Sequence, residues 1–427
     1  MIDKAAQASY SYLLSGRKYG PLHLSSSRKR ILRPGHVRGA NNAAVLQLLR
    51  QQQSLSRAEL ARRTGLTEGT ISRITSSLLE RHLVMEEGAE NSTGGRPGIR
   101  LRLDGRNLLS MGVEILNWET RIAVGTMGGQ IVKNLHFRTP GTPAETLDLI
   151  ANQFEVNRKL VQPATLHGIG ITTRGLVNSE TGVIEVGNAP GWMNVNARKE
   201  LERRLKTSVY LENDVRAAAL SEYNHGGTDT QGSRCLLFVK VGEGVGIGIV
   251  LDGHLHRGPH LAAGEIGQMV VADPPKPDAH THDNPGCLEA LSSNPAICER
   301  DRRNAGKRRR TASGDSTAQV KRICHLAMEG DAAALKTIRE TSRYLGRAIA
   351  NAVWLLDADV VVIDGAITDA WPLVSAGIRS QFPGAEFPNF RDLILRPSTL
   401  AGQATMMAAV GLPFTELFST GELVASR

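Results

Sequence analysis

Residues 56–84 read SRAELARRTGLTEGTISRITSSLLERHLV, a stretch with start and stop signals for two successive helices. Ser56 and Glu59 have the spacing of a capping box, in which each side chain bonds the backbone amide of the other residue. Gly65 can adopt the positive φ of a tight turn because it has no Cβ. Thr67 then offers a hydroxyl that can cap a second helix. The stretch therefore predicts two helices joined by a tight turn.

The second of these helices has two distinct faces. Ile71, Ile74 and Leu78 recur at helical spacing, which predicts a buried face. The opposite face carries small polar residues and one arginine, a composition that suits a helix in the major groove of DNA. The residues expected to contact DNA from the two helices are Arg57, Thr67, Glu68, Thr70, Ser72, Arg73 and Ser76. An ordinary αα-hairpin without a DNA role fits this stretch equally well.

The flanking segments favour the DNA-binding interpretation. Residues 42–53 predict a preceding helix, and residues 86–103 predict a β-hairpin with the tip sequence GGRPG at residues 94–98. Arg96 at this tip is expected to enter a minor groove or to clamp phosphates, and a plain solvated turn is the alternative. Together these segments predict a winged helix-turn-helix over residues 40–104, with double-stranded DNA as its partner.

The positive charge of the chain is concentrated at its N-terminal end. Residues 1–40 contain eight lysine and arginine residues and one acidic residue. Residues 41–104 contain nine basic and seven acidic residues. These two segments account for the whole net charge of +9, so residues 105–427 are neutral overall. This distribution is expected of a protein that neutralises DNA phosphates with one end. Residues 1–39 are expected to form a basic, disordered tail.

The composition is that of a globular intracellular protein. The chain has 427 residues, enough for two or three domains, with 41% hydrophobic and 22% charged residues. Its four cysteines show no regular framework, which fits a reducing compartment. No apolar run is long enough to span a bilayer, and residues 9–14 are too short and too polar for a signal peptide. We therefore expect a cytoplasmic protein without membrane association, located at the nucleoid when it is bound to DNA.

From about Leu108 the sequence alternates between strand-like and helix-like segments. The expected elements are three strands within residues 109–137, a helix at 142–160, a strand at 166–173, a glycine- and asparagine-rich loop up to Trp192, a helix at 195–205, a strand at 208–212, a strand pair at 235–251, a long helix at 332–356 and a strand at 359–364. The second half of this region repeats the alternation of strands and helices seen in the first half. This repetition predicts an α/β fold of two lobes with a cleft between them.

Seven short motifs resemble those of the ROK family, which unites sugar-responsive repressors and sugar kinases. They are Gly168-Ile169-Gly170, Gly175-Leu176-Val177, Asn188-Ala189-Pro190-Gly191-Trp192, Glu212-Asn213-Asp214, the glycines 242, 244, 246 and 248, Ala263-Gly264-Glu265-Ile266-Gly267-Gln268, and Gly286-Cys287-Leu288-Glu289. Each motif is weak alone, but their number and order are specific. The resemblance covers about residues 40–415. It implies an N-terminal winged helix-turn-helix followed by an actin-like, two-lobed ROK domain at residues 108–415, which holds sugar in its cleft.

The family's phosphate loop is replaced in this sequence. The kinases that the chain resembles have an aspartate and a glycine- and threonine-rich loop after the first strand, whereas residues 112–118 read GVEILNW. Bulky side chains and the Glu114 carboxylate are poorly suited to cradling phosphates. Glycines 242–248 resemble a second phosphate loop, but a tight strand pair is the better interpretation. Asp214 matches the family's catalytic base, yet without a nucleotide cradle we expect it only to accept hydrogen bonds, with no ATP and no catalytic residues.

The family's zinc site is altered as well. The family uses a histidine and three cysteines, and the matching positions here are Gln268, His280, His282 and Cys287. Imidazole replaces thiolate readily as a zinc ligand, so the resemblance makes His280, His282 and Cys287 candidate ligands of a structural zinc ion. Water would complete the tetrahedron, because glutamine is a poor zinc ligand. A metal-free loop with two solvated histidines is the alternative.

The resemblance also assigns sugar contacts to the cleft. The matching positions are Asn188, Asn213, Asp214, Glu265, Gln268 and Glu289. Carboxylates suit a polyol because each can accept hydrogen bonds from two adjacent hydroxyls. Gln268 replaces a histidine that contacts both sugar and metal in the family, so the identity of the sugar stays open. An alternative role for Asp214 is capping of the helix expected at residues 215–223.

These features predict a DNA-binding transcriptional regulator, namely a repressor whose operator binding is controlled by a sugar or sugar derivative. We expect a homodimer or homotetramer, because operators of this kind contain symmetric half-sites. One alternative is a sugar kinase with an appended DNA-binding domain, which ATP consumption with a sugar panel would reveal. Another is a DNA-binding scaffold whose sugar lobe is inactive. Thermal-shift measurements with the same sugar panel would distinguish it from a sugar-binding repressor.

Overall fold

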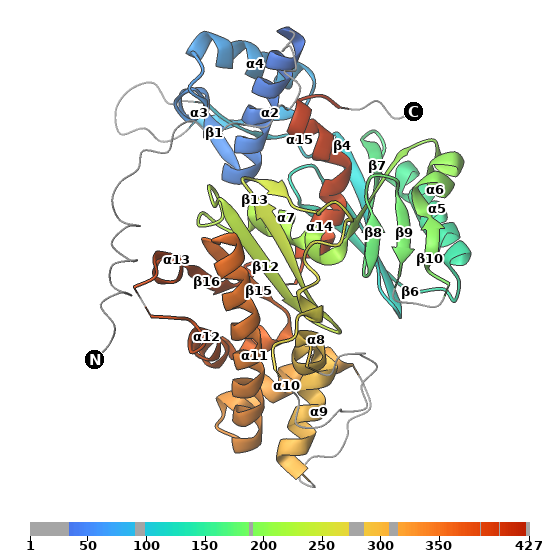
Figure 1. The fold of residues 1–427 in the computed structure, drawn as a ribbon. Helices are drawn as coiled ribbons and strands as arrows, with labels where there is room; N and C mark the ends of the chain where they lie inside the picture. Colours follow the sequence, from blue (N-terminus) through green and yellow to red (C-terminus); the bar gives the residue numbers. More distant parts are fainter. Residues whose placement is uncertain are drawn as a thin grey trace.

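The computed structural model describes residues 34–89, 99–187, 191–272, 286–306, 315–384, 386–400 and 402–423. Within this part of the chain the N-terminal module is a winged helix (Figure 1). Its elements are the helices α2 (Pro34–Gln52), α3 (Arg57–Thr64) and α4 (Glu68–Glu80) and an antiparallel sheet in the order β1 (Ser54–Ser56), β3 (Ile99–Leu103), β2 (Val84–Ala89). Helix α4 has the place of a recognition helix, and β2 and β3 form the base of the wing.

The local signals around the turn between α3 and α4 are confirmed. Ser56 and Glu59 form the reciprocal capping box, in which Ser56 N donates to Glu59 Oε2 at 2.8 Å. Gly65 adopts a φ of 70°, and the Thr67 side chain caps α4. The predicted buried face of α4 is found at Ile71, Ile74 and Leu78. Short-range physical chemistry therefore sets the shape of this half of the module.

Other parts of the module differ from the prediction. Helix α2 begins at Pro34 rather than at residue 42, so it takes in residues that were expected to belong to the disordered tail. Strand β1 was not predicted, because three residues are too short to display a pattern and their partner β3 lies far along the chain. The predicted wing tip with Arg96 lies outside the described residues.

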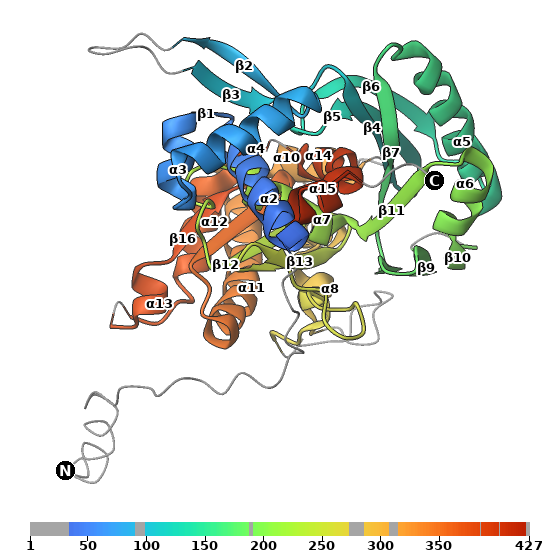
Figure 2. The same cartoon turned by 90° about the horizontal axis from the view of Figure 1, so that it is seen from above.

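The first lobe, formed by residues 108–213, is built on a mixed five-stranded sheet. Its strand order is β11 (Ser208–Asn213), β7 (Thr165–Thr173), β4 (Leu108–Ile115), β5 (Glu119–Thr126), β6 (Ile131–Arg138). Helices α5 (Pro143–Leu160) and α6 (Ala197–Leu205) cover its outer face (Figure 2), where Phe154 and Leu201 are buried against the strands. The loop predicted up to Trp192 is wrong in part, since it contains the strands β8 (Leu176–Asn178) and β9 (Val183–Val186), which form a small sheet with β10 (Met193–Asn196) just beyond it.

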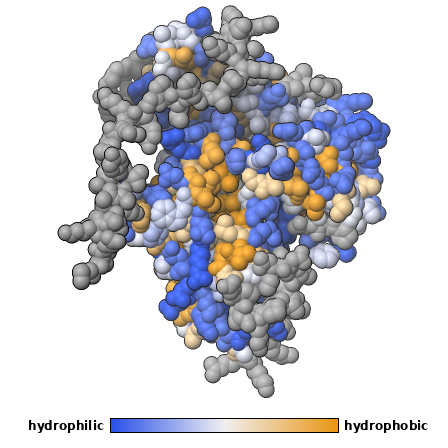
Figure 3. Space-filling view, in the orientation of Figure 1, coloured by the Kyte–Doolittle hydropathy of each residue, from blue (hydrophilic) through white to orange (hydrophobic). Residues whose placement is uncertain are grey.

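The second lobe, formed by residues 235–397, repeats the arrangement. Its sheet has the order β14 (His254–Leu255), β13 (Val245–Leu251), β12 (Cys235–Val241), β15 (Val360–Asp364), β16 (Ile394–Pro397). The predicted long helix is α11 (Ala332–Leu356), which packs with α9 (Asn294–Ala305), α10 (Ser316–Met328) and α12 (Trp371–Arg379). Figure 3 shows apolar residues gathered in the middle of one face, over β12 and β13, with hydrophilic residues around them.

Two helices lie between the lobes, α7 (Asp214–His225) and α14 (Ala404–Gly411). Glycines in the strands let them approach the sheets closely. A Cβ on Gly170 of β7 would lie 2.0 Å from Ala409 O, and a Cβ on Gly248 of β13 would lie 2.4 Å from Ala219 Cβ. Gly246 and Gly248 therefore belong to strand β13 and to its packing against α7, and Gly242 and Gly244 form the turn of the predicted strand pair.

The winged helix shares a hydrophobic core with the C-terminal end of the chain. Helix α15 (Thr415–Thr420) lies along α2 in both ribbon views (Figures 1 and 2). Phe414, Leu417 and Phe418 are buried in one cluster with Leu46 and Leu49 of α2. The DNA-binding module is therefore seated on the rest of the protein by packed side chains, in addition to its covalent connection at residues 104–107.

Candidate functional site

The outer face of α4 presents the side chains that the sequence assigned to DNA. Glu68, Ser72, Arg73 and Ser76 are exposed, and Thr70 is half-buried. Within the described part of the chain no hydrogen bond or ion pair engages the Arg73 guanidinium. A free guanidinium on a recognition helix can donate two hydrogen bonds to a guanine edge.

Three of the predicted DNA-contacting residues have structural partners instead. Arg57 donates from Nη2 to Glu86 Oε1 at 3.0 Å and from Nε to Thr75 Oγ1 at 3.2 Å, so it braces the wing strand β2 against α4. The hydroxyls of Thr67 and Thr70 lie 2.9 Å apart, and the Thr67 hydroxyl accepts from the Thr70 amide. These side chains position α4, and a direct DNA contact by them stays a prediction.

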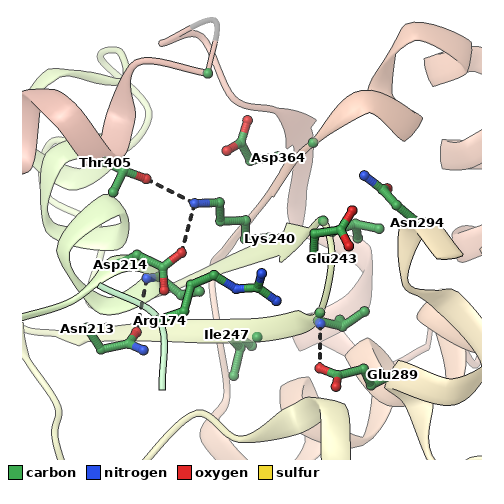
Figure 4. A pocket seen from close by; sticks show the side chains of 18 of the residues that line it. Arg174, Asn213, Asp214, Lys240, Glu243, Ile247, Glu289, Asn294, Asp364 and Thr405 are labelled. Atoms are coloured by element: carbon green, nitrogen blue, oxygen red, sulfur yellow. Dashed lines mark hydrogen bonds and ion pairs between the residues drawn. The ribbon is translucent and has the colours of Figure 1, made fainter. Parts of the chain in front are cut away.

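A second site is a cleft of about 730 Å³ between the lobes (Figure 4). A volume of this size suits a small organic ligand. The predicted sugar contacts that line it are Asn213, Asp214, Glu265, Gln268 and Glu289. The structure thus brings five of the six predicted residues to one cavity, whereas Asn188 lies outside the described residues. Binding of sugar by these five side chains stays a prediction.

Asn213 is already engaged by the fold. It is the N-cap of α7, where its Oδ1 accepts from the amides of Val215 and Arg216 at 3.0 and 3.1 Å. Its Nδ2 donates to Gly175 O at 3.0 Å, which joins α7 to the first lobe. One amide hydrogen remains for a ligand. Since Asn213 caps the helix, the alternative that Asp214 serves as the cap is wrong.

Asp214 instead forms an ion pair on the floor of the cleft (Figure 4). Its Oδ2 lies 3.0 Å from Nζ of Lys240, which also donates to Thr405 Oγ1 at 3.1 Å. Burial lowers the pKa of Lys240, but the carboxylates of Asp214 and Glu114 outweigh it, so the pKa lies above its usual value. Lys240 is therefore a permanent cation that occupies one lone-pair direction of Asp214.

Glu114 belongs to the segment that the sequence resemblance matches to the phosphate loop of the family's kinases. Its side chain is buried at the end of β4, 3.6 Å from the Arg121 guanidinium, and burial raises the pKa of this carboxyl. The turn that follows is tight, because the Leu116 amide donates to Glu119 O at 2.9 Å. This amide is therefore engaged within the turn, and it does not point toward a ligand.

The remaining predicted sugar contacts come from the second lobe. Glu289 accepts from the Val245 amide through Oε2 at 2.9 Å, which orients its carboxylate toward the glycine turn between β12 and β13. Glu265 and Gln268 lie at the short helix η1 (Ile266–Gln268), next to Glu289, and both are exposed. Within the described part of the chain the Glu265 carboxylate has no hydrogen-bond partner, so both its oxygens are available to hydroxyls.

Several cleft residues were missed by the sequence reasoning. They are Arg174, Lys240, Glu243, Asp364 and Thr405. A signal existed for Lys240, since it is the single charge in the strand sequence CLLFVKV, and a charge in a buried strand needs a partner. The other four carry no such signal, because only the folded chain brings their separate segments together.

The described residues contribute only one of the predicted zinc ligands. Cys287 is buried, and its Sγ accepts from the Ala290 amide at 3.5 Å at the start of α8 (Leu288–Ser292). His280 and His282 lie outside the described residues. Within the described ranges, no three histidine, cysteine or acidic side chains are grouped so that they could hold a metal ion. Zinc binding therefore stays a prediction.

Two sequence profiles match this chain. Residues 110–412 match the profile described as the ROK family, and residues 41–88 match the one described as the IclR helix-turn-helix domain. Together they cover most of the winged helix and nearly all of both lobes. Among the helices that the structure describes, none is long and apolar enough to cross a membrane.

Curated relatives include repressors of sugar genes. The DNA-binding transcriptional dual regulator NagC of Escherichia coli (strain K12) is 31% identical over 352 residues, which are 81% of this chain and 84% of that protein. A protein of Escherichia coli O6:H1 (strain CFT073) with the same identity and coverage is described as the N-acetylglucosamine repressor. The xylose repressor of Bacillus spizizenii is 25% identical over 373 residues, which are 86% and 93% of the two chains.

Solved structures of regulators and kinases share the fold. A ROK family transcriptional regulator described as a homologue of the E. coli MLC protein has a TM-score of 0.74 and 26% identity, covering 90% of this chain and 98% of that one. A ROK hexokinase from Thermus thermophilus has a TM-score of 0.59 and 25% identity, covering 72% and 99%. The likeness to the regulator thus extends over more of this chain than the likeness to the kinase.

Proposed function

Because the chain belongs to the ROK family and its N-terminal module is a winged helix, we propose that the protein is a repressor that binds operator DNA and responds to a sugar. Helix α4 reads the major groove, with Arg73 as the side chain that contacts bases. A sugar or sugar derivative binds in the cleft and changes the affinity for DNA. The protein acts as a homodimer or homotetramer, because a recognition helix from each of two subunits then matches two half-sites.

The observation that carries this proposal is the composition of the cleft. Several hydrogen-bond acceptors converge on one cavity, among them Asp214 at the start of α7 and Glu265 and Glu289 of the second lobe. Acceptors facing each other suit a ligand with several hydroxyl groups, such as a monosaccharide. The names of the relatives provide the first probes, namely N-acetylglucosamine and xylose. A panel of these two sugars, glucose and their phosphate esters, titrated by calorimetry into the full chain, tests the proposal.

We propose further that the protein does not phosphorylate its sugar. A general base must take a proton from the attacking hydroxyl, but the Lys240 ammonium, 3.0 Å from Asp214 Oδ2, already occupies that oxygen. The Leu116 amide, in the segment that the resemblance matches to the kinases' phosphate loop, is occupied within its own turn. We therefore expect no ADP above background in a coupled assay with ATP and the sugar panel. Sugar-dependent turnover that disappears in Asp214→Ala would favour the kinase alternative.

The zinc proposal makes a separate prediction. If His280, His282 and Cys287 hold a structural zinc ion, purified protein carries about one zinc per chain, because such sites bind the metal tightly. Cys287→Ser should remove that zinc and lower the melting temperature. Cys298→Ser is the control, since Cys298 lies on α9 and is no predicted ligand. Elemental analysis that finds no zinc in protein purified without chelator would contradict the proposal.

A further inference from the structure

Helix α7 begins at the cleft and ends at the DNA-binding module. Its N-terminal end carries Asn213 and Asp214, which line the cleft, and its C-terminal end carries Asn224 and His225. Twelve residues of α-helix span about 18 Å, at 1.5 Å per residue. The single helix α7 therefore reaches from the predicted sugar site to the DNA-binding module.

The N-terminal end of α7 is fixed to both lobes. Asn213 Nδ2 donates to Gly175 O, and Arg216 Nη2 donates to Val177 O at 2.9 Å, both on the first lobe. Asp214 is paired with Lys240 on the second lobe. A change in the angle between the lobes must therefore either move α7 or break these contacts.

The C-terminal end of α7 is bonded to α2 of the winged helix. Asn224 Oδ1 accepts from Gln47 Nε2 at 2.8 Å and from Arg50 Nη2 at 2.7 Å. Its Nδ2 donates to Leu220 O at 2.7 Å, within α7 itself. Asn224 is buried, with 3% of its surface exposed, whereas its partners Gln47 and Arg50 are half-buried. Gln231, just beyond α7, adds a bond from Nε2 to Gln51 O at 2.6 Å.

Arg50 is an unusual residue at the centre of this contact. Its guanidinium lies over the ring of Phe418, 4.0 Å from the ring centre, and burial lowers its pKa to about 9. Within the described residues no carboxylate pairs with it, and its Nε is buried without a hydrogen-bond partner. His225 next to it is kept neutral, because burial and then the charge of Arg50 lower its pKa to about 4. A half-buried cation held only by amide oxygens and a ring keeps part of its desolvation cost, which favours opening of this contact.

We infer that the contact of Gln47 and Arg50 with Asn224, here called the α2–α7 seam, transmits sugar binding to the winged helix. The inference rests on the proposed function and adds the route of its regulation. Sugar in the cleft changes the lobe angle, α7 moves with the lobes, and Asn224 shifts relative to α2. The seam is a two-state element, since its hydrogen bonds are either made in full or exchanged for water. Both sites then bias a single equilibrium, as reciprocal coupling requires.

The test is the ratio of operator dissociation constants with and without N-acetylglucosamine, or the first panel sugar that binds, measured on the full chain. We expect about a 5- to 150-fold change in the wild type, the usual range of such coupling. In Asn224→Ala the ratio should fall to within about twofold of one, while calorimetric sugar affinity is unchanged. Arg50→Met should have the same effect, and the double variant should lose no more than either single variant.

Asn157→Ala provides a matched control. Asn157 is also a buried asparagine near the end of a helix, where it accepts from Lys133 Nζ at 3.0 Å and donates to the carbonyl four residues earlier at 2.7 Å. This variant should lose comparable stability and keep the wild-type ratio. If the wild type responds to sugar and Asn224→Ala responds equally, the seam carries no coupling. If no panel sugar changes the DNA affinity of the wild type, the proposed function fails, and the inference fails with it.

Discussion

Replacing Arg73 by alanine is expected to weaken operator binding by about 1–3 kcal/mol and to relax the sequence preference at the contacted base pair. The guanidinium is exposed on α4 and free of partners within the described residues, so it is available to a guanine edge. Non-specific binding should change little, because phosphate contacts from the other basic residues remain. Arg96→Ala, at the predicted wing tip, should instead weaken binding with less change in sequence preference.

The Arg73 measurement needs a salt-controlled titration of operator and random DNA side by side. Arg343→Ala is the matched control, since Arg343 is also an exposed arginine on a helix but lies on α11 in the second lobe. Loss of the same charge there should leave operator affinity unchanged. Equal operator affinity for wild type and Arg73→Ala would show that α4 docks differently or does not enter the groove.

Replacing Glu265 by alanine is expected to weaken sugar binding by about 1.5–3 kcal/mol, the usual value of a hydrogen bond to a charged group. Glu265 is the cleanest probe of the cleft, because its carboxylate has no hydrogen bond to lose within the described structure. Asp214→Ala would also remove sugar contacts, but it would leave the Lys240 ammonium without its partner. Its effect therefore mixes ligand binding with the stability of the cleft.

Calorimetry with the panel sugar that binds best measures the Glu265 effect. Glu180→Ala is the control, because Glu180 is an exposed glutamate on a turn that does not line the cleft. It should bind sugar like the wild type. Unchanged affinity in Glu265→Ala, with wild-type melting behaviour, would place the sugar elsewhere than proposed.

The winged helix shows which structural features a sequence can predict. The capping box at Ser56 and Glu59 and the positive φ at Gly65 are local, because the residues that make them are neighbours in the chain. Strand β1 and the packing of Phe418 on α2 were not predictable in the same way. Both depend on partners far along the chain, and the apolar spacing of α15 does not say which surface it covers.

In the cleft, too, some features could be predicted from the sequence and others could not. The family motifs placed Asn213, Asp214, Glu265, Gln268 and Glu289 in one site, since motif order carries the information of a known fold. They did not show that the side-chain oxygen of Asn213 caps α7 or that Lys240 forms an ion pair with Asp214. These contacts depend on side-chain directions, which change the expected chemistry of a carboxylate from a base to a fixed acceptor.

The central claim is that occupancy of the cleft controls DNA binding. Its most direct test is the operator affinity of the full chain at fixed salt, measured without sugar and with a saturating sugar that calorimetry shows to bind. The proposed repressor function predicts that the operator dissociation constant rises about 5- to 150-fold with sugar. An operator affinity that stays the same at saturating sugar would contradict the claim.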